Sequence, residues 1–496
     1  MNRFFLVPLL CSALFSFGSF SAAEPQASLW QQLAKTDLDY VYQQIKANHP
    51  GVLDTENPAF ISWLEQGYKE GQQALSSVQN LNDLMNIHRR YFAGFADGHL
   101  YLQLGYQRNF VQWPGVIVQL RQGKTTVSSA SQSWSEPLPA VGAELVSCDG
   151  LTADQWLDQR ILPNRFNLPV LKAARLLYTP FLLKDEGVGN YPKAQQCIFA
   201  EQGQLREYKL VWRGTDESQW RAALSPYVTT EQFSFNAFGK QNYWLTIPGF
   251  SPNQTEQQQL KAVIKQLSEL QSAEWVVFDM RGNRGGNSQW GRDLATALYG
   301  EAYVKNELKR FPDQSMAYWR ASAENTADIR GFLPDLAQQF GKDSAVFAEF
   351  SQLTERMTKA DAQHLVPQRL TKPNEHNKNP TVQWKAIQPR VHTKVIFLTD
   401  IRCGSACLDF ADIMLRLPGV IHAGQPTWAD TLYMDIRTVQ LPSKLGYFSI
   451  PQKLYRNRPR SNNQPYEPEA EWTFSGDIQA DAELKKWLSE KIQNNI

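Results

Sequence analysis

The chain has 496 residues, of which 42% are hydrophobic and 12% aromatic, so it has room for roughly two or three globular domains. Its 50 basic and 49 acidic residues leave a formal net charge of +1, which gives no reason to expect nucleic acid or an anionic membrane as a partner. Function therefore has to be sought in local motifs.

The first residues have the pattern of a secretory signal peptide. A short basic start is followed by an apolar run over residues 4–20 and by small residues up to Ala23. We expect cleavage after Ala23, which makes residues 1–23 a signal peptide and the mature chain periplasmic or secreted. Cys11 could instead anchor a lipid, but Leu10 precedes it where a lipobox needs a small residue. No other apolar run approaches the roughly twenty residues of a membrane span, so no stable membrane insertion is expected.

The pattern over residues 24–105 is helical. Apolar residues recur three and four positions apart between Leu29 and His88, and a Pro-Gly pair interrupts them. We expect an N-terminal helical region that ends in the stretch FADGHLYLQL.

Residues 106–215 change to short alternating runs. VIVQLRQ, TTVSSAS, AELVSCDG and YKLVWRG alternate apolar with polar positions, which is typical of strands in a small sheet. GAELVSCDG has the strand, turn and glycine of a PDZ-like module. We expect a PDZ-like β-rich module here.

Strands and helices alternate over residues 225–490, which predicts an α/β core. The buried-strand patterns EWVVFDM and TKVIFLTD are each followed by a glycine-containing turn and a helical pattern. A polar stretch at about 305–388, including SMAYWRASAEN, interrupts this alternation and is expected to be a helical insertion.

Two of the strand-to-helix turns could carry chemistry, because backbone N–H groups are unpaired at a helix start. In the first turn, Gly285 and Gly286 allow the backbone to approach a ligand closely. In the second, Ser405 begins a helix, and the N–H of Ala406 can point at an oxyanion. A tight turn and a helix N-cap serine are the purely structural alternatives.

Four cysteines remain after the expected cleavage, and an oxidising compartment favours disulfides. Cys403 and Cys407 are close enough in sequence to bridge one turn, and a pairing of Cys148 with Cys197 would follow. The alternatives are buried free thiols or a metal site, but the paired Cys and His spacing of zinc sites does not occur.

In combination, these motifs resemble the tail-specific (C-terminal processing) serine peptidase family. The resemblance rests on VVFDMRGNRGGN, VIFLTDIRCGSACLDFAD and GVIHAGQPTW, and it extends to FADGHLYLQL and GAELVSCDG. It implies a crotonase/Clp-protease-like core, a spiral of β-β-α units, with an N-terminal helical region and a PDZ-like module. It further implies a serine peptidase that needs no metal or organic cofactor.

The resemblance also assigns roles to residues of the two turns. Ser405 is the nucleophile, and the oxyanion donors are the N–H of Ala406 and that of Gly285 or Gly286. One branch of the family has a lysine as base where this sequence has Asp430. An aspartate cannot be the same kind of base, so a Ser-Lys dyad is not expected.

His99 is the expected base, as in the branch that resembles the core of tricorn protease, where a histidine follows Asp-Gly. A histidine can accept the serine proton and return it to the leaving amine around neutral pH. The acid that orients it is expected to be Glu467 in NNQPYEPEAEW, with Glu469 and Asp97 as alternatives. A disulfide between Cys403 and Cys407 would hold the nucleophile turn.

The sequence therefore predicts an exported serine peptidase that acts on peptides or unfolded protein segments. The PDZ-like module would bind a substrate's C-terminal strand by β-augmentation. Two other functions stay open, namely a non-catalytic ligand- or peptide-binding protein on the same scaffold and an esterase-type acyl hydrolase. The missing lysine favours the binding protein, whereas Ser405, His99 and the two glycines favour the enzyme. The oligomeric state is not predicted.

Overall fold

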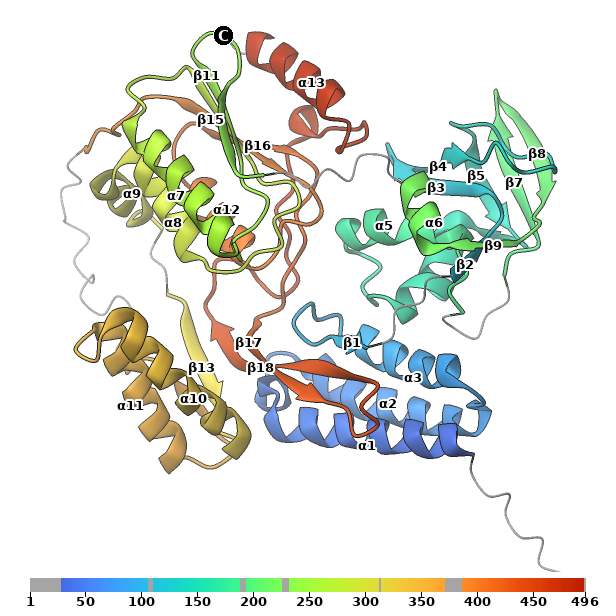
Figure 1. Cartoon of the computed structure of the whole chain (residues 1–496), viewed down its shortest axis with the longest axis horizontal. Coiled ribbons are helices and arrows are strands. Elements are labelled where there is room, and N and C mark those ends of the chain that lie inside the picture. Colours follow the sequence, from blue (N-terminus) through green and yellow to red (C-terminus); the bar gives the residue numbers. More distant parts are fainter. Residues whose placement is uncertain are drawn as a thin grey trace, which may run out of the picture.

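The computed structural model describes residues 28–105, 110–187, 193–224, 232–311, 314–370 and 386–494. These residues form a mixed α/β structure in which helices accompany four sheets (Figure 1). The expected signal peptide, residues 1–23, lies outside them. Among the described helices, none combines the length and the apolar character needed to cross a membrane.

A five-stranded sheet forms the centre of the C-terminal half. Its order is β10-β11-β12-β15-β16; four strands run parallel, and β10 pairs antiparallel with β11 at one edge. The central strands are apolar and buried, as expected for a parallel sheet covered on both faces. The strands are β10 (Ser234–Ala237), β11 (Asn242–Thr246), β12 (Trp275–Asp279), β15 (Lys394–Thr399) and β16 (Val420–Gly424).

Helices cover both faces of this sheet. One face carries α7 (Gln254–Glu269), α8 (Gln289–Tyr299), α9 (Glu301–Leu308) and α12 (Ala406–Met414). The other carries α13 (Asp481–Asn494), which buries Leu484, Leu488 and Ile492 at helical spacing. Figure 1 shows these layers around β11, β15 and β16.

A second sheet joins segments that are distant in sequence. Its long strand β18 (Gly446–Arg456) pairs with β1 (Leu102–Leu104), with β13 (Met316–Arg320) and with β17 (Tyr433–Gln440). Strand β14 (Leu365–Pro367) adds to β13. Through β18, the N-terminal region and the insertion are both tied to the C-terminal part of the chain.

Three N-terminal helices pack on this second sheet. They are α1 (Leu29–Asn48), α2 (Pro58–Ala74) and α3 (Leu81–Ala93). Their apolar faces share one hydrophobic core with Phe448, Ile450 and Leu454 of β18. This packing fixes the direction in which the chain leaves α3.

The β-rich module contains a sheet of order β3-β4-β5-β7-β8, with β6 beside β5, and a separate pair of β2 with β9. A disulfide joins Cys148 and Cys197, which face each other on β5 and β7. The hydrophobic core of the module also includes Ala429 and packs against Ile401 and Trp428. The module therefore lies directly on the turn that contains Ser405. Its elements are β2 (Phe110–Trp113), β3 (Val116–Arg121), β4 (Lys124–Ala130), β5 (Glu144–Cys148), β6 (Leu151–Thr152), α4 (Ala153–Trp156), α5 (Lys172–Tyr178), β7 (Gln196–Glu201), β8 (Gln204–Lys209), β9 (Arg213–Asp216) and α6 (Glu217–Leu224).

The insertion forms a helical hairpin of α10 (Ala323–Phe340) and α11 (Ala345–Lys359), which stands apart from the central sheet in Figure 1. The expectation that this stretch is helical throughout is wrong for SMAYWRASAEN, because residues 316–320 are strand β13. A short apolar run of this length fits either period, and pairing with β18 decides it.

Candidate active site

Ser405 and His99 line one cavity of about 720 Å³. Its walls come from the serine turn, from the segment after α3 and from the β-rich module. The cavity therefore lies where the main parts of the chain meet. Other side chains at its wall are Asp97, Phe166, Tyr178, Arg284, Trp428 and Asp430.

The two predicted turns lie side by side because β12 and β15 are adjacent parallel strands, whose carboxyl ends meet at the same edge. Hydrogen bonds join the turns directly: the N–H of Gly282 donates to Asp400 Oδ1 at 3.0 Å, and that of Gly404 donates to the carbonyl of Asn283 at 3.3 Å. Asp400 is buried, and burial raises its pKa. The turns therefore form one unit.

Ser405 has a backbone conformation that non-glycine residues rarely adopt, with φ 53° and ψ −124°. Such a conformation costs about 1–3 kcal/mol and persists only where its surroundings enforce it. Here the Ser405 N–H donates to Asp430 Oδ2 at 2.8 Å, and Asp430 is only 4% exposed. The side chain does not cap α12, so the N-cap alternative does not describe this serine. Its hydroxyl makes no hydrogen bond to any described residue and faces the cavity.

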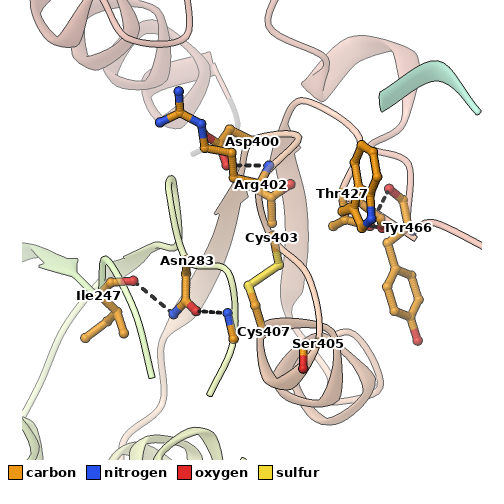
Figure 2. Close-up of a disulfide and its surroundings, with 12 residues drawn as sticks. Ile247, Asn283, Asp400, Arg402, Cys403, Ser405, Cys407, Thr427 and Tyr466 are labelled. Carbon is orange, nitrogen blue, oxygen red and sulfur yellow. Dashed lines mark hydrogen bonds between the residues drawn. A yellow bond between two sulfur atoms is a disulfide. The ribbon is translucent and has the colours of Figure 1, made fainter. Parts of the chain in front are cut away.

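A disulfide spans the serine turn. Cys403 and Cys407 are bonded and fully buried, on either side of Ser405 (Figure 2). The Cys403 carbonyl also accepts the N–H of Trp428 at 3.0 Å. Both disulfides favoured by the sequence are therefore present. The part of the chain that the structure describes contains no group of three or more His, Cys, Asp or Glu side chains placed to hold a metal ion.

The glycine pair lies against the serine turn. A Cβ on Gly285 would stand 2.6 Å from Ser405 Cβ, and one on Gly286 would stand 2.3 Å from the Phe250 carbonyl oxygen, so both positions need glycine. The N–H of Gly285 is already taken by Asn283 Oδ1, at 2.9 Å. No described acceptor takes the N–H of Gly286 or of Ala406. These last two are therefore the available donors.

His99 is positioned by β18. The Ser449 hydroxyl donates to the His99 carbonyl at 2.7 Å and accepts the Tyr101 N–H at 3.0 Å. The His99 side chain is 16% exposed, and its buried Nδ1 has no hydrogen-bond partner in the part of the chain that the structure describes. Asp97 Oδ1 lies 3.9 Å from that Nδ1.

Asp97, not Glu467, is the carboxylate that the structure places beside His99. Asp97 is 4% exposed, and its Oδ1 accepts the His99 N–H at 2.9 Å and the Thr431 hydroxyl at 2.8 Å. Glu467 instead forms an exposed ion pair with Lys172 at 2.6 Å and is not part of the cavity wall. Glu469 is exposed as well.

The sequence did not reveal the roles of Asp430 and Thr431. Asp430 stood out only as a departure from the lysine of related peptidases, and no motif marks Thr431. Both contacts cross from one distant segment to another, 25 residues apart for Ser405 with Asp430 and 334 for Asp97 with Thr431. Only an expectation that the lysine position faces the nucleophile could have suggested Asp430.

Comparison with known proteins places this site in a family. Residues 243–468 match the model of peptidase family S41, whereas no curated protein matches the sequence. The chain is similar to the solved structure of mature CPAF complexed with lactacystin, with 16% identity, a TM-score of 0.58 and coverage of 94% of this chain and 100% of that one.

Two further solved structures match less well in shape. The photosystem II D1 C-terminal processing protease has 12% identity and a TM-score of 0.32, with coverage of 90% of this chain and 93% of that one. The tricorn protease has 12% identity and a TM-score of 0.38, with coverage of 93% and 37%. At these identities, the likeness to mature CPAF shows the fold alone. The family match spans both turns of the site, and the chain therefore carries a peptidase family S41 domain and is a serine-type peptidase.

Proposed function

We propose that this protein is an exported serine peptidase that cleaves peptides or unfolded protein segments through an acyl-enzyme on Ser405. The proposal rests on one observation. The Ser405 hydroxyl, which makes no hydrogen bond to any described residue, lines the same cavity as His99. Two buried disulfides fit an oxidising compartment and so support export.

In the proposed mechanism, His99 accepts the Ser405 proton as the hydroxyl oxygen attacks the carbonyl carbon of the scissile bond. The N–H groups of Ala406 and Gly286 stabilise the resulting oxyanion. The C–N bond then breaks, and His99 returns the proton to the leaving amine. Water, activated by the same histidine, hydrolyses the ester and frees Ser405.

We assign the orienting role to Asp97 in place of Glu467. An acid in this role holds the imidazole in the right tautomer and stabilises the imidazolium that forms. Asp97 has the burial and the position for it, since its Oδ1 already accepts the backbone N–H of His99. Glu467 would have to leave Lys172 to serve.

The walls of the cavity suit a polypeptide substrate. Phe166 and Trp428 pack edge to face at 4.9 Å and offer aromatic surface beside Ser405. Phe166 belongs to the β-rich module, whose larger sheet has β8 at one edge. The side chains of β8 are nearly all exposed, and among the described strands it pairs only with β7. We propose that a substrate strand adds to an edge of this module by β-augmentation.

The test is cleavage by the mature chain of a mixture of peptides and urea-unfolded proteins, with new termini identified by mass spectrometry. Ser405→Ala should abolish cleavage. Ser268→Ala, an exposed serine on α7, is the matched control and should cleave like the wild type. Equal cleavage by the Ser405→Ala variant would contradict the proposal.

The same proteins separate the two alternatives. Hydrolysis of p-nitrophenyl acetate that depends on Ser405, without any peptide cleavage, would identify an esterase. Retention of peptides from the mixture without hydrolysis of either substrate would identify a binding protein.

A further inference from the structure

Three buried polar atoms, which form no hydrogen bond with any described residue, converge beside the proposed base. They are Nε2 of His49, Oδ2 of Asp97 and Nδ1 of His99. His49 Nε2 lies 3.6 Å from Asp97 Oδ2, and Asp97 Oδ1 lies 3.9 Å from His99 Nδ1. Buried polar atoms are rarely left unpaired, so the convergence of three calls for a functional explanation.

The ring of His49 is held rigidly. Its Nδ1 accepts the N–H of Gly51 at 3.0 Å, and its face stacks on Phe60 with ring centres 4.3 Å apart. Tyr433 packs edge-on against it at 4.8 Å, and Arg320 Nη1 donates to its carbonyl at 2.8 Å. The ring therefore cannot turn away from Asp97 without breaking several contacts.

These contacts also set the tautomer. Because Nδ1 accepts a hydrogen bond, the proton of the neutral ring sits on Nε2. Burial lowers the pKa of His49, which keeps the ring neutral around pH 7. Its Nε2–H therefore faces Asp97 Oδ2, the carboxylate oxygen that accepts no hydrogen bond from the described residues.

We propose that His49 is a positioning residue, whose Nε2–H holds Asp97 Oδ2 so that the other carboxylate oxygen stays directed at His99 Nδ1. Thr431 acts with it, since its hydroxyl donates to Oδ1. This inference rests on the proposed roles of Ser405 and His99. It adds a residue from the end of α1, which touches neither substrate nor nucleophile.

The two long distances fit this role. An N–H···O bond is about 2.9 Å. The His49–Asp97 distance of 3.6 Å exceeds it by about 0.7 Å, and the Asp97–His99 distance of 3.9 Å by about 1 Å. Catalytic hydrogen bonds are often long until substrate binds. Shortening of the His49–Asp97 and Asp97–His99 distances would then bring the His99 imidazole into place as Ser405 attacks.

Two substitutions separate the functions of the His49 ring nitrogens. His49→Asn keeps an acceptor near the Gly51 N–H but removes the donor to Asp97. His49→Gln places an amide N–H near the position of Nε2. The readouts are the rate of Ser405 labelling by a fluorophosphonate and kcat and KM for fluorescein-labelled casein, with thermal unfolding as the check on folding.

We expect His49→Asn to slow labelling about 10- to 100-fold and to lower kcat while KM is kept, since misplacement of a catalytic group by about 1 Å has effects of this size. His49→Gln should stay within about threefold of the wild type, because it restores the donor. A folded His49→Asn protein that labels at the wild-type rate would overturn the proposal. So would equal losses in both variants.

A second variant and a second measurement keep the test independent of folding and of activity. If His49→Asn does not fold, Thr431→Val removes the other donor to Asp97 and should also slow labelling; an unchanged rate would overturn the proposal. Histidine ¹⁵N NMR of the wild type should show His49 protonated on Nε2, and protonation on Nδ1 would overturn it. A wild type that neither reacts with the probe nor cleaves casein would instead refute the proposed function.

Discussion

Removing each disulfide in turn should separate stability from activity. The double variants Cys403→Ala/Cys407→Ala and Cys148→Ala/Cys197→Ala are matched, because each replaces two buried half-cystines by the same residue. They differ in position. The first pair encloses Ser405, and the second lies within the sheet of the β-rich module.

The expected stability losses follow from the loops that the bonds close. The sequence separation is 4 for Cys403 with Cys407 and 49 for Cys148 with Cys197. By the chain-entropy relation, the short loop contributes about 2 kcal/mol to the free energy of unfolding and the long loop about 4 kcal/mol. The variant that lacks the Cys403–Cys407 bond should therefore lose less unfolding free energy than the variant that lacks the Cys148–Cys197 bond.

For activity we expect the reverse order. The Cys403–Cys407 bond connects the two ends of the turn that presents Ser405, and its loss frees a strained backbone to relax. We expect Ser405 labelling by a fluorophosphonate to fall at least about tenfold in this variant. Labelling of the folded Cys148→Ala/Cys197→Ala variant should remain near the wild-type rate.

The assay combines urea unfolding, followed by tryptophan fluorescence, with labelling at a urea concentration where both variants are folded. The reasoning fails if the variant lacking the Cys403–Cys407 bond labels at the wild-type rate. It fails equally if the loss of labelling in the two variants follows their loss of stability.

Three further predictions concern single residues. Asp430→Ala removes the acceptor of the part-buried hydrogen bond from the Ser405 N–H and should cost about 1–3 kcal/mol in the free energy of unfolding, whereas Asp430→Asn keeps an oxygen acceptor and should cost less. Urea unfolding of both variants checks this, and equal losses would contradict the role of the hydrogen bond. Burial lowers the pKa of His88 to about 4, so between pH 6.5 and 4 the unfolded chain binds a proton that the folded chain does not, and stability falls as the pH falls. His88→Leu should remove about 3 kcal/mol of that loss in urea titrations at pH 7 and pH 4, and an unaltered pH dependence would refute it. Glu467→Gln breaks an exposed ion pair with Lys172 and should change stability by at most about 1 kcal/mol and leave labelling intact, so a large loss of labelling would restore Glu467 as the orienting acid.

Local patterns were enough to predict much of the fold. The helical period before residue 93, the apolar strands at 275–279 and 394–399 and the turns after them are all present. In each of these elements, the residues that the hydrophobic spacing places inside are buried, and the turn residues lie at the ends of the strands. Strand β13 was missed because five residues carry too little periodicity to outweigh the helical pattern around them, and its partner β18 lies far along the chain.

Residues of the candidate site could be predicted only where they lie within one short sequence motif. Ser405, Ala406 and the glycine pair lie in two such turns, and the structure brings these turns together. Glu467 was chosen by sequence likeness in a tail where the alignment slips, and its side chain pairs with Lys172 instead. The contacts of His49 with Asp97 form between separate segments, and sequence spacing carries no information on such contacts.

The pairing of β1 with β18 has a consequence for when the enzyme becomes active. The hydroxyl that holds the His99 carbonyl comes from Ser449, 350 residues later in the chain. During synthesis, the segment bearing His99 emerges first and lacks this partner until β18 has been made. Long-range pairings of this kind form late, because a large loop must close before the contact is gained. If His99 is the base, as we propose, catalytic competence is expected as one of the last events of folding, which protects the nascent chain from premature proteolysis.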